Sequence, residues 1–382
     1  MQELLHITII LFASLLATQF SGRIGIPAVV GQLLVGILIG PAVLNLVHQG
    51  ELIHFLSELG VILLMFLAGM EANLELLKSY LKPSLVVAIS GVIIPVAAFY
   101  LVTLAMGYQA HTAIFYGIVF AATSVSITVE VLQEYNKVKT NTGAVILGAA
   151  VADDIIAVIL LSFFISSSKS DSGSSNQLIF EVLGQLAFLL FLIALVKYIV
   201  PAIFKFVNKF DNFEKNTFLA LLLCFTTALL ANSVGMSAVI GSFFAGLAIG
   251  QTKYATEIEH ETSIFAYIFF IPIFFASIAL PLKLDGIISN LPIIVLFTVL
   301  AVATKLIPCY MVGRSFKFSK MDALTIGGGM VSRGEMALII VQIGLADKLI
   351  SSHTYSELVI VVILSTIIAP FILKQSFKTK KA

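Results

Sequence analysis

Two adjacent aspartates, Asp153 and Asp154, lie inside the apolar stretch AVILGAAVADDIIAVILLSFF. A carboxylate at the centre of a membrane helix costs roughly 2.5 to 3.5 kcal/mol, so such groups persist beside a partner, a water-filled cavity or a cargo. The pair therefore predicts an ion or proton site. The alternative, a pair at a helix end that faces water, is disfavoured because apolar residues continue for about two turns on both sides.

Lys305, in VLAVATKLIPCYM, is a further isolated charge in an apolar run. Its natural partner is one of the two aspartates. Successive helix positions point about 100° apart, so Asp153 and Asp154 cannot both address the same lysine equally. One aspartate can pair with Lys305 while the other faces a cavity. Two alternatives stay open: a salt bridge with no transport role, and a lysine that reaches a membrane interface.

Two further stretches have polar, small-residue centres: AATSVSITVE (Ala121 to Glu130) and GGGMVSRGEM (Gly327 to Met336). Their positions predict two broken helices that cross near the middle of the membrane. Close helix packing through small residues is the alternative. Arg333 and Glu335 favour the break, because charges at the ends of half-helices neutralise the helix dipoles.

The composition indicates what must position these residues. The chain has 59% hydrophobic and 11% charged residues, a net charge of +1 and a mean hydropathy of +1.07, which excludes an ordinary soluble domain and predicts an all-α polytopic membrane protein. Scattered charge gives no indication of nucleic acid as a partner. Cys224 and Cys309 lie in apolar runs without metal-ligand spacing. The N-terminus lacks a basic segment and a cleavage site, so we expect a retained first helix.

About 13 transmembrane helices can be placed along the chain, with one uncertain division at Asn232 to Gly235 that would otherwise leave twelve. The expected spans are 3–20, 26–46, 52–70, 83–106, 112–131, 142–167, 178–204, 216–232, 236–251, 260–281, 289–313, 322–345 and 355–374. With thirteen, only Lys169, Lys283 and Lys348 fall in outer loops, and most other basic residues fall in inner ones. Because cytoplasmic loops are rich in Lys and Arg, we expect the N-terminus outside and the C-terminus in the cytoplasm.

Taken in order, the motifs resemble the monovalent cation:proton antiporter-2 (CPA2) family, in particular sodium/proton antiporters of the NapA and GerN type. The resemblance covers nearly the whole chain. It rests on the paired aspartates, Lys305, AATSVSITV and three longer motifs: GRIGIPAVVGQLLVGILIGP (Gly22 to Pro41), LGVILLMFLAGME (Leu59 to Glu71) and VSRGEMALI (Val331 to Ile339).

The resemblance implies a homodimer with a NhaA-like fold of two inverted repeats and crossing broken helices. It implies a dimer domain at about 1–82 and 208–288, a linking helix at 178–207, and a core domain at about 83–167 and 289–376. In such a protein Asp154 would be the main cation carboxylate and Asp153 would pair with Lys305. Thr123 and Ser124 would line the unwound helix, while Glu335 and Arg333 would balance the half-helix charges.

The function that follows is exchange of sodium, and of lithium, for protons across the cell membrane by alternating access, with sodium held at Asp154 and Asp153. Exchange would be electrogenic if Lys305 and Asp154 each released a proton for one sodium. We expect a transporter, not an enzyme, without a cofactor. Oxygen ligands suit small cations but do not rank sodium, lithium and potassium, so a potassium/proton antiporter is an alternative.

Three other functions remain to be weighed. In a NhaA-fold organic anion symporter Lys305 could be the anion site, but the paired carboxylates disfavour this. An intramembrane aspartyl protease needs two carboxylates from separate helices that share a proton, whereas neighbouring residues diverge. A purely structural membrane protein would leave the buried charges unexplained.

Overall fold

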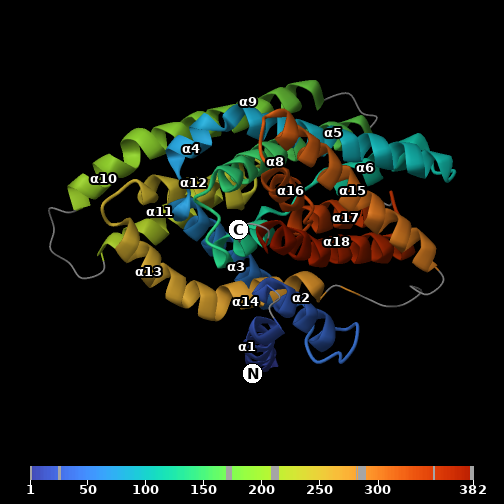
Figure 1. Cartoon of the computed structure of the whole chain (residues 1–382), viewed down its shortest axis with the longest axis horizontal. Coiled ribbons are helices and arrows are strands. Elements are labelled where there is room, and N and C mark those ends of the chain that lie inside the picture. Colours follow the sequence, from blue (N-terminus) through green and yellow to red (C-terminus); the bar gives the residue numbers. More distant parts are fainter. Residues whose placement is uncertain are drawn as a thin grey trace. The chain divides into compact units, whose positions relative to one another are not determined.

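Helices make up all the regular structure in the described part of the chain, residues 2–24, 27–168, 174–207, 215–280, 282, 290–346 and 349–378 of a computed structural model (Figure 1). In lipid a helix satisfies its backbone hydrogen bonds within one segment, as these apolar runs require. The α-helices are α1 (Gln2–Ile24), α2 (Ala28–Ile39), α3 (Glu51–Glu71), α4 (Leu74–Ser79), α5 (Leu81–Ala105), α6 (Ala110–Ala121), α7 (Val125–Glu134), α8 (Asn141–Ser168), α9 (Ser174–Ala194), α10 (Val200–Val207), α11 (Lys215–Ser233), α12 (Ala238–Gly250), α13 (Ala255–Phe265), α14 (Ile271–Ala279), α15 (Leu291–Ser315), α16 (Lys320–Gly329), α17 (Glu335–Ala346) and α18 (Ser352–Lys378). Two π-helical turns, η1 (Leu195–Ile199) and η2 (Ala266–Phe270), join α9 to α10 and α13 to α14.

Nine stretches of the described residues are helical, long and apolar enough to cross a membrane. They are Gln2–Arg23, Glu51–Glu71, Leu81–Ala105, Ala110–Glu134, Leu183–Lys205, Asn216–Ser233, Ala255–Ala279, Leu291–Ser315 and Thr354–Phe377. Two shorter apolar helices, α2 and α12, lie between them in sequence. Each of the thirteen expected spans contains helix, and α11 ends at Ser233, within the expected division at Asn232 to Gly235. The chain is therefore a multi-pass membrane protein.

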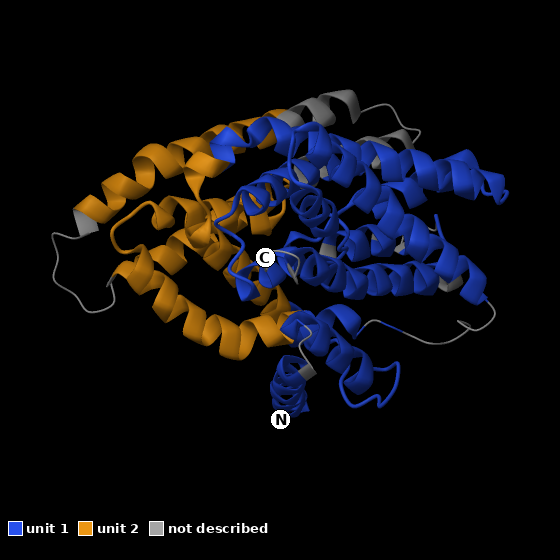
Figure 2. Ribbon diagram, in the orientation of Figure 1, with its two compact units in different colours: residues 1–54, 77–157, 275–382 blue, residues 55–76, 158–274 orange. Residues whose placement is uncertain are grey.

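The chain forms two compact units (Figure 2). Unit 1 consists of residues 1–54, 77–157 and 275–382, and unit 2 of residues 55–76 and 158–274. In unit 2, α3 and α12 approach so closely that a Cβ at Gly246 would overlap the backbone oxygen of Phe66, and one at Gly69 that of Phe243. Small residues permit this kind of backbone contact between membrane helices.

Unit 1 shows the same order of elements twice. A 25-residue helix, α5 or α15, precedes an interrupted helix, α6–α7 or α16–α17, and then a long helix, α8 or α18. Helices α5 and α15 pack against each other, and each also packs against the first half of the interrupted helix that follows it. In Figure 1 the second set runs from orange to red. This packing brings both interruptions into one unit.

Both predicted interruptions are present and are shorter than the polar stretches that predicted them. The first covers Ala122 to Ser124, where the backbone is extended, and α7 begins again at Val125. The second covers Met330 to Gly334. Hydroxyl and small side chains fit within a helix as well as within a break, so composition alone located the interruptions only to within several residues.

Candidate ion-binding site

The buried charges that the sequence indicated come together in unit 1, beside the two interruptions. Lys305 of α15 and Arg333 of the second interruption are both completely buried, and so is Asp153 of α8. Such groups remain in an apolar interior only when paired or hydrogen-bonded. Their contacts therefore define the chemistry of the site.

Lys305 is held by two groups. Its Nζ lies 3.1 Å from Asp153 Oδ1 and donates to Thr123 Oγ1 at 2.6 Å. Gly91 of α5 lies against the ammonium, because a Cβ at that position would be 3.4 Å from Nζ. The lysine thus connects α8 to the first interruption, and α5 packs against it at Gly91.

Asp153 uses only one of its two oxygens in these contacts. Oδ1 accepts from Lys305, whereas Oδ2 is buried and has no hydrogen-bond partner among the described residues. A buried carboxylate oxygen without a donor is costly. It can be satisfied by a proton or by a cation. The carboxylate therefore offers a position for either species beside the ammonium.

The side chains of Asp154 and Glu335 lie outside the described residues. Asp154 follows Asp153 in α8, and Glu335 is the first residue of α17. Their assignments as the main cation carboxylate and as a charge-balancing group remain predictions.

The guanidinium of Arg333 donates hydrogen bonds to three backbone carbonyls. Nη1 donates to Val331 O at 2.7 Å, and Nη2 donates to Phe120 O at 2.8 Å and Ala301 O at 3.0 Å. Phe120 is the penultimate residue of α6. The carbonyls of the last turn of a helix have no hydrogen-bond partner within that helix. The guanidinium carbon also lies 5.7 Å from the centre of the Phe120 ring. A positive charge at this end of α6 complements the half-helix dipole.

The two interruptions are hydrogen-bonded to each other. The backbone N–H of Ser124 donates to Ser332 O at 2.9 Å, and Ser332 Oγ donates to Ser124 O at 2.6 Å. Thr128 Oγ1 donates to Gly329 O at 2.7 Å and lies 2.9 Å from Ser332 Oγ. The sequence motifs did not single out Thr128 or Ser332. Both lie within stretches predicted to be interrupted, which was the only available signal.

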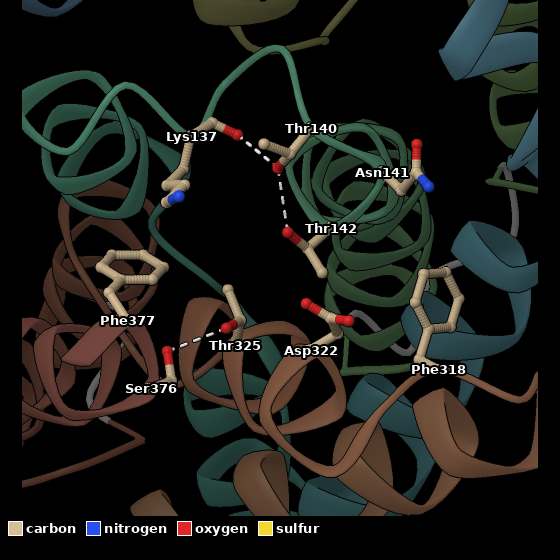
Figure 3. Close-up of a pocket in the computed structure, with 9 residues that line it drawn as sticks. All are labelled: Lys137, Thr140, Asn141, Thr142, Phe318, Asp322, Thr325, Ser376 and Phe377. Carbon is tan, nitrogen blue, oxygen red and sulfur yellow. Dashed lines mark hydrogen bonds between the residues drawn. The ribbon is translucent and has the colours of Figure 1, made fainter. Parts of the chain in front are cut away.

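A separate pocket of about 340 Å³ lies at the start of α8 and α16 and the end of α18 (Figure 3). Thr140 Oγ1 donates to Lys137 O at 2.6 Å and lies 3.0 Å from Thr142 Oγ1, while Thr325 Oγ1 donates to Ser376 Oγ at 2.8 Å. None of the three buried charges lines this pocket. Along α8 and α16 the apolar cluster that includes Val145, Ala149, Ile326 and Met330 lies between the pocket and the buried charges.

No resident metal centre is indicated in the described ranges, since no group of three or more His, Cys, Asp or Glu side chains there could hold a metal ion.

The chain is similar to known proteins along almost its whole length. A family described as "sodium/hydrogen exchanger, transmembrane" matches residues 7–379. The chain is 46% identical to a Na⁺/H⁺ antiporter of Enterococcus hirae, over 98% of this chain and 97% of that protein. It is 42% identical to the Na⁺/H⁺-K⁺ antiporter GerN of Bacillus cereus, over 98% of this chain and 96% of that protein.

The fold is also similar to that of a solved structure. The sodium proton antiporter MjNhaP1 of Methanocaldococcus jannaschii superposes with a TM-score of 0.64 at 17% identity, covering 98% of this chain and 97% of that one. Similarity at this level of identity concerns the arrangement of the helices alone.

Proposed function

The chain belongs to the sodium/hydrogen exchanger family, and from this premise we propose that it is a secondary active transporter that exchanges sodium for protons across the cell membrane. The two relatives named above are cation antiporters, and this chain matches almost the whole length of each. The organic anion symporter and the protease are therefore not favoured.

One observation supports the location of exchange: the buried Lys305 to Asp153 pair in which Asp153 Oδ2 has no hydrogen-bond partner among the described residues. A carboxylate so placed binds either a proton or a small cation, because both satisfy the same oxygen. Competition for one site that opens alternately to each side produces antiport without further machinery. Raising the proton concentration then weakens the apparent affinity for sodium.

Sodium would be held by carboxylate oxygens of Asp153 and Asp154, with hydroxyls of Thr123 and Ser124 and waters completing its ligands. Thr123 Oγ1 already lies beside the ammonium that sodium would displace. Glu335 and Arg333 would balance the half-helix ends while the site changes its charge. Because the two carboxyls and the lysine interact closely, their titration belongs to the site as a whole.

We propose that sodium displaces Lys305 from Asp153, that Lys305 then releases a proton, and that Asp154 releases a second. Two protons would leave for each sodium that binds, so one net charge would cross the membrane in each cycle. A membrane potential would contribute about 2.3 kcal/mol per 100 mV to that exchange.

The architecture we propose is a NhaA-like fold with about 13 transmembrane helices in two inverted repeats. The repeated order of α5 to α8 and α15 to α18 supports it. The placement of basic residues supports an outer N-terminus and a cytoplasmic C-terminus. We further propose a homodimer, with a dimer domain at about 1–82 and 208–288, a linking helix at 178–207 and a moving core at about 83–167 and 289–376.

Potassium is a second candidate cargo, because the relative GerN is named as an antiporter of sodium, potassium and protons. Carboxylate and hydroxyl oxygens accept either ion, so selectivity depends on cavity size and on the waters retained. Lithium, the smaller ion, would bind through the same oxygens.

The test is reconstitution in liposomes with an imposed proton gradient, followed with a pH-sensitive dye on addition of sodium, lithium or potassium. We expect sodium to collapse the gradient in the wild type and not in Asp154→Asn. The matched control is Asp322→Asn, which makes the same change at the pocket of Figure 3, away from the buried charges, and should keep transport. No response to any cation from folded wild-type protein, from mildly acidic to mildly alkaline pH, would exclude antiport.

A further inference from the structure

Each helix interruption leaves backbone groups without partners in their own helix, and in this protein each interruption partly satisfies the other. The backbone N–H of Ser124 donates a hydrogen bond to Ser332 O, and the hydroxyl of Ser332 donates one to Ser124 O. Ser124, Thr128 and Ser332 are all buried, so these bonds have no competition from bulk water. Losing one leaves a buried donor or acceptor unsatisfied.

Thr128 adds a second connection from α7. Its hydroxyl lies within hydrogen-bonding distance of both Gly329 O, at 2.7 Å, and Ser332 Oγ, at 2.9 Å. A hydroxyl has a single proton, so Thr128 donates to one of the two at a time. In either case it ties the first turn of α7 to the end of α16 or to the residues that follow it. Both of these contacts are with the second interruption and its helix, and neither is with Lys305 or Asp153.

These connections lie one residue from the groups of the ion site. Ser124 follows Thr123, whose Oγ1 accepts from Lys305. Ser332 precedes Arg333, whose guanidinium holds Phe120 O at the end of α6. A shift between the interruptions would therefore move Thr123 away from the ammonium and would disturb the end of α6 at the same time. Positioning of this kind needs rotamers fixed by surrounding hydrogen bonds.

We propose that Thr128 and Ser332 are positioning residues that hold the two interruptions in one arrangement and thereby set the affinity of the site for its cation. This inference rests on the proposed antiport. The two residues act through Thr123 and Lys305 and do not themselves bind the ion. Their loss therefore weakens sodium binding more than it slows the transport cycle.

The experiment compares Thr128→Val, which keeps the shape and removes the hydroxyl, with Thr103→Val. Thr103 of α5 is equally buried, and its hydroxyl donates to Phe99 O at 2.6 Å within its own helix. Thr128→Ser keeps a hydroxyl at position 128, and Ser332→Ala removes the hydroxyl that lies 2.9 Å from Thr128 Oγ1 and donates to Ser124 O. Each purified protein is checked for thermal unfolding, reconstituted, and assayed for the sodium dependence of exchange at fixed pH.

For Thr128→Val and Ser332→Ala we expect the sodium KM to rise about three- to tenfold, the range of one net hydrogen bond, with the maximal rate within about twofold of wild type. Thr128→Ser and Thr103→Val should resemble the wild type. If Thr128→Val does not fold, Ser332→Ala carries the comparison.

The inference is overturned if an exchanging wild type and Thr128→Val share one KM, if Thr103→Val shows the same shift, or if only the maximal rate falls. A wild type that does not exchange sodium instead overturns the proposed function.

Discussion

Lys305→Met separates a lysine that carries a proton from one that only stabilises the fold. Methionine has a similar length and cannot donate, so it removes both the contact to Asp153 and the hydrogen bond to Thr123. If Lys305 carries the second proton, the variant exchanges one proton for one sodium. The cycle then moves no net charge, and the membrane potential no longer affects it.

The size of the effect follows from the charge. With one net charge per cycle, a potential of about 100 mV contributes about 2.3 kcal/mol, which supports an approximately 50-fold sodium gradient in the wild type. The same potential supports no sodium gradient in the Lys305→Met variant, because its cycle moves no net charge. The assay measures sodium accumulation in proteoliposomes at equal internal and external pH, with the potential set by the gradient of a permeant anion, because potassium is itself a candidate cargo.

Stability supplies a second readout. Removing one partner of a buried ion pair costs about 3 to 5 kcal/mol, because the remaining charge is uncompensated. If sodium takes the place of the ammonium at Asp153, as proposed, it should raise the unfolding temperature of Lys305→Met more than that of the wild type.

The matched control is Lys197→Met, which changes an exposed lysine of η1 that lies over the Tyr198 ring. It should keep the wild-type voltage dependence. Sodium accumulation in Lys305→Met that responds to voltage as in the wild type would refute Lys305 as the proton carrier.

Three further changes test contacts within the two units, two of them beside the site in unit 1 and one between α3 and α12 in unit 2. Gly334→Ala places a Cβ 2.5 Å from Ser124 Oγ; we expect a loss of about 1 to 3 kcal/mol, partly restored by adding Ser124→Gly, as measured by thermal unfolding in detergent. Arg333→Lys cannot reach all three carbonyls, and we expect unfolding at a lower temperature with sodium KM also raised, because a compact ammonium lacks the planar fork; equal stability would contradict the assigned hydrogen bonds. Gly246→Ala should lower the unfolding temperature, since its Cβ overlaps a backbone oxygen, whereas Gly184→Ala, whose nearest neighbour is 4.0 Å away, should not; equal effects would refute close packing of α3 and α12.

Hydrophobicity was sufficient to predict an all-helical, multi-pass chain, and isolated charge directed attention to the residues that come together in unit 1. A lysine and an aspartate in apolar runs must find partners in lipid, which is why an encounter between Lys305 and one of the paired aspartates could be expected from the sequence. The choice between Asp153 and Asp154 depends on how α8 is rotated, and apolar residues on every face of that helix give no signal for rotation.

The connection between the interruptions could not be predicted in the same way. Thr128 and Ser332 are 204 residues apart, and their contact depends on the crossing of two interrupted helices to within one residue. Each sequence stretch offers several hydroxyls and small residues, so their composition is compatible with many registers. Register in this region is set by tertiary packing, in particular by Gly334 fitting beside Ser124.

The ion pair also constrains how the protein is made. Asp153 and Lys305 are 152 residues apart, so at about 5 to 20 residues per second the ribosome reaches the lysine roughly 8 to 30 s after the aspartate. Throughout that interval α8 must enter the bilayer with an acidic group whose insertion costs roughly 2.5 to 3.5 kcal/mol and whose eventual partner is not yet synthesised. A chain truncated before α15 would therefore keep Asp153 in the bilayer without the lysine that pairs with it in the complete protein.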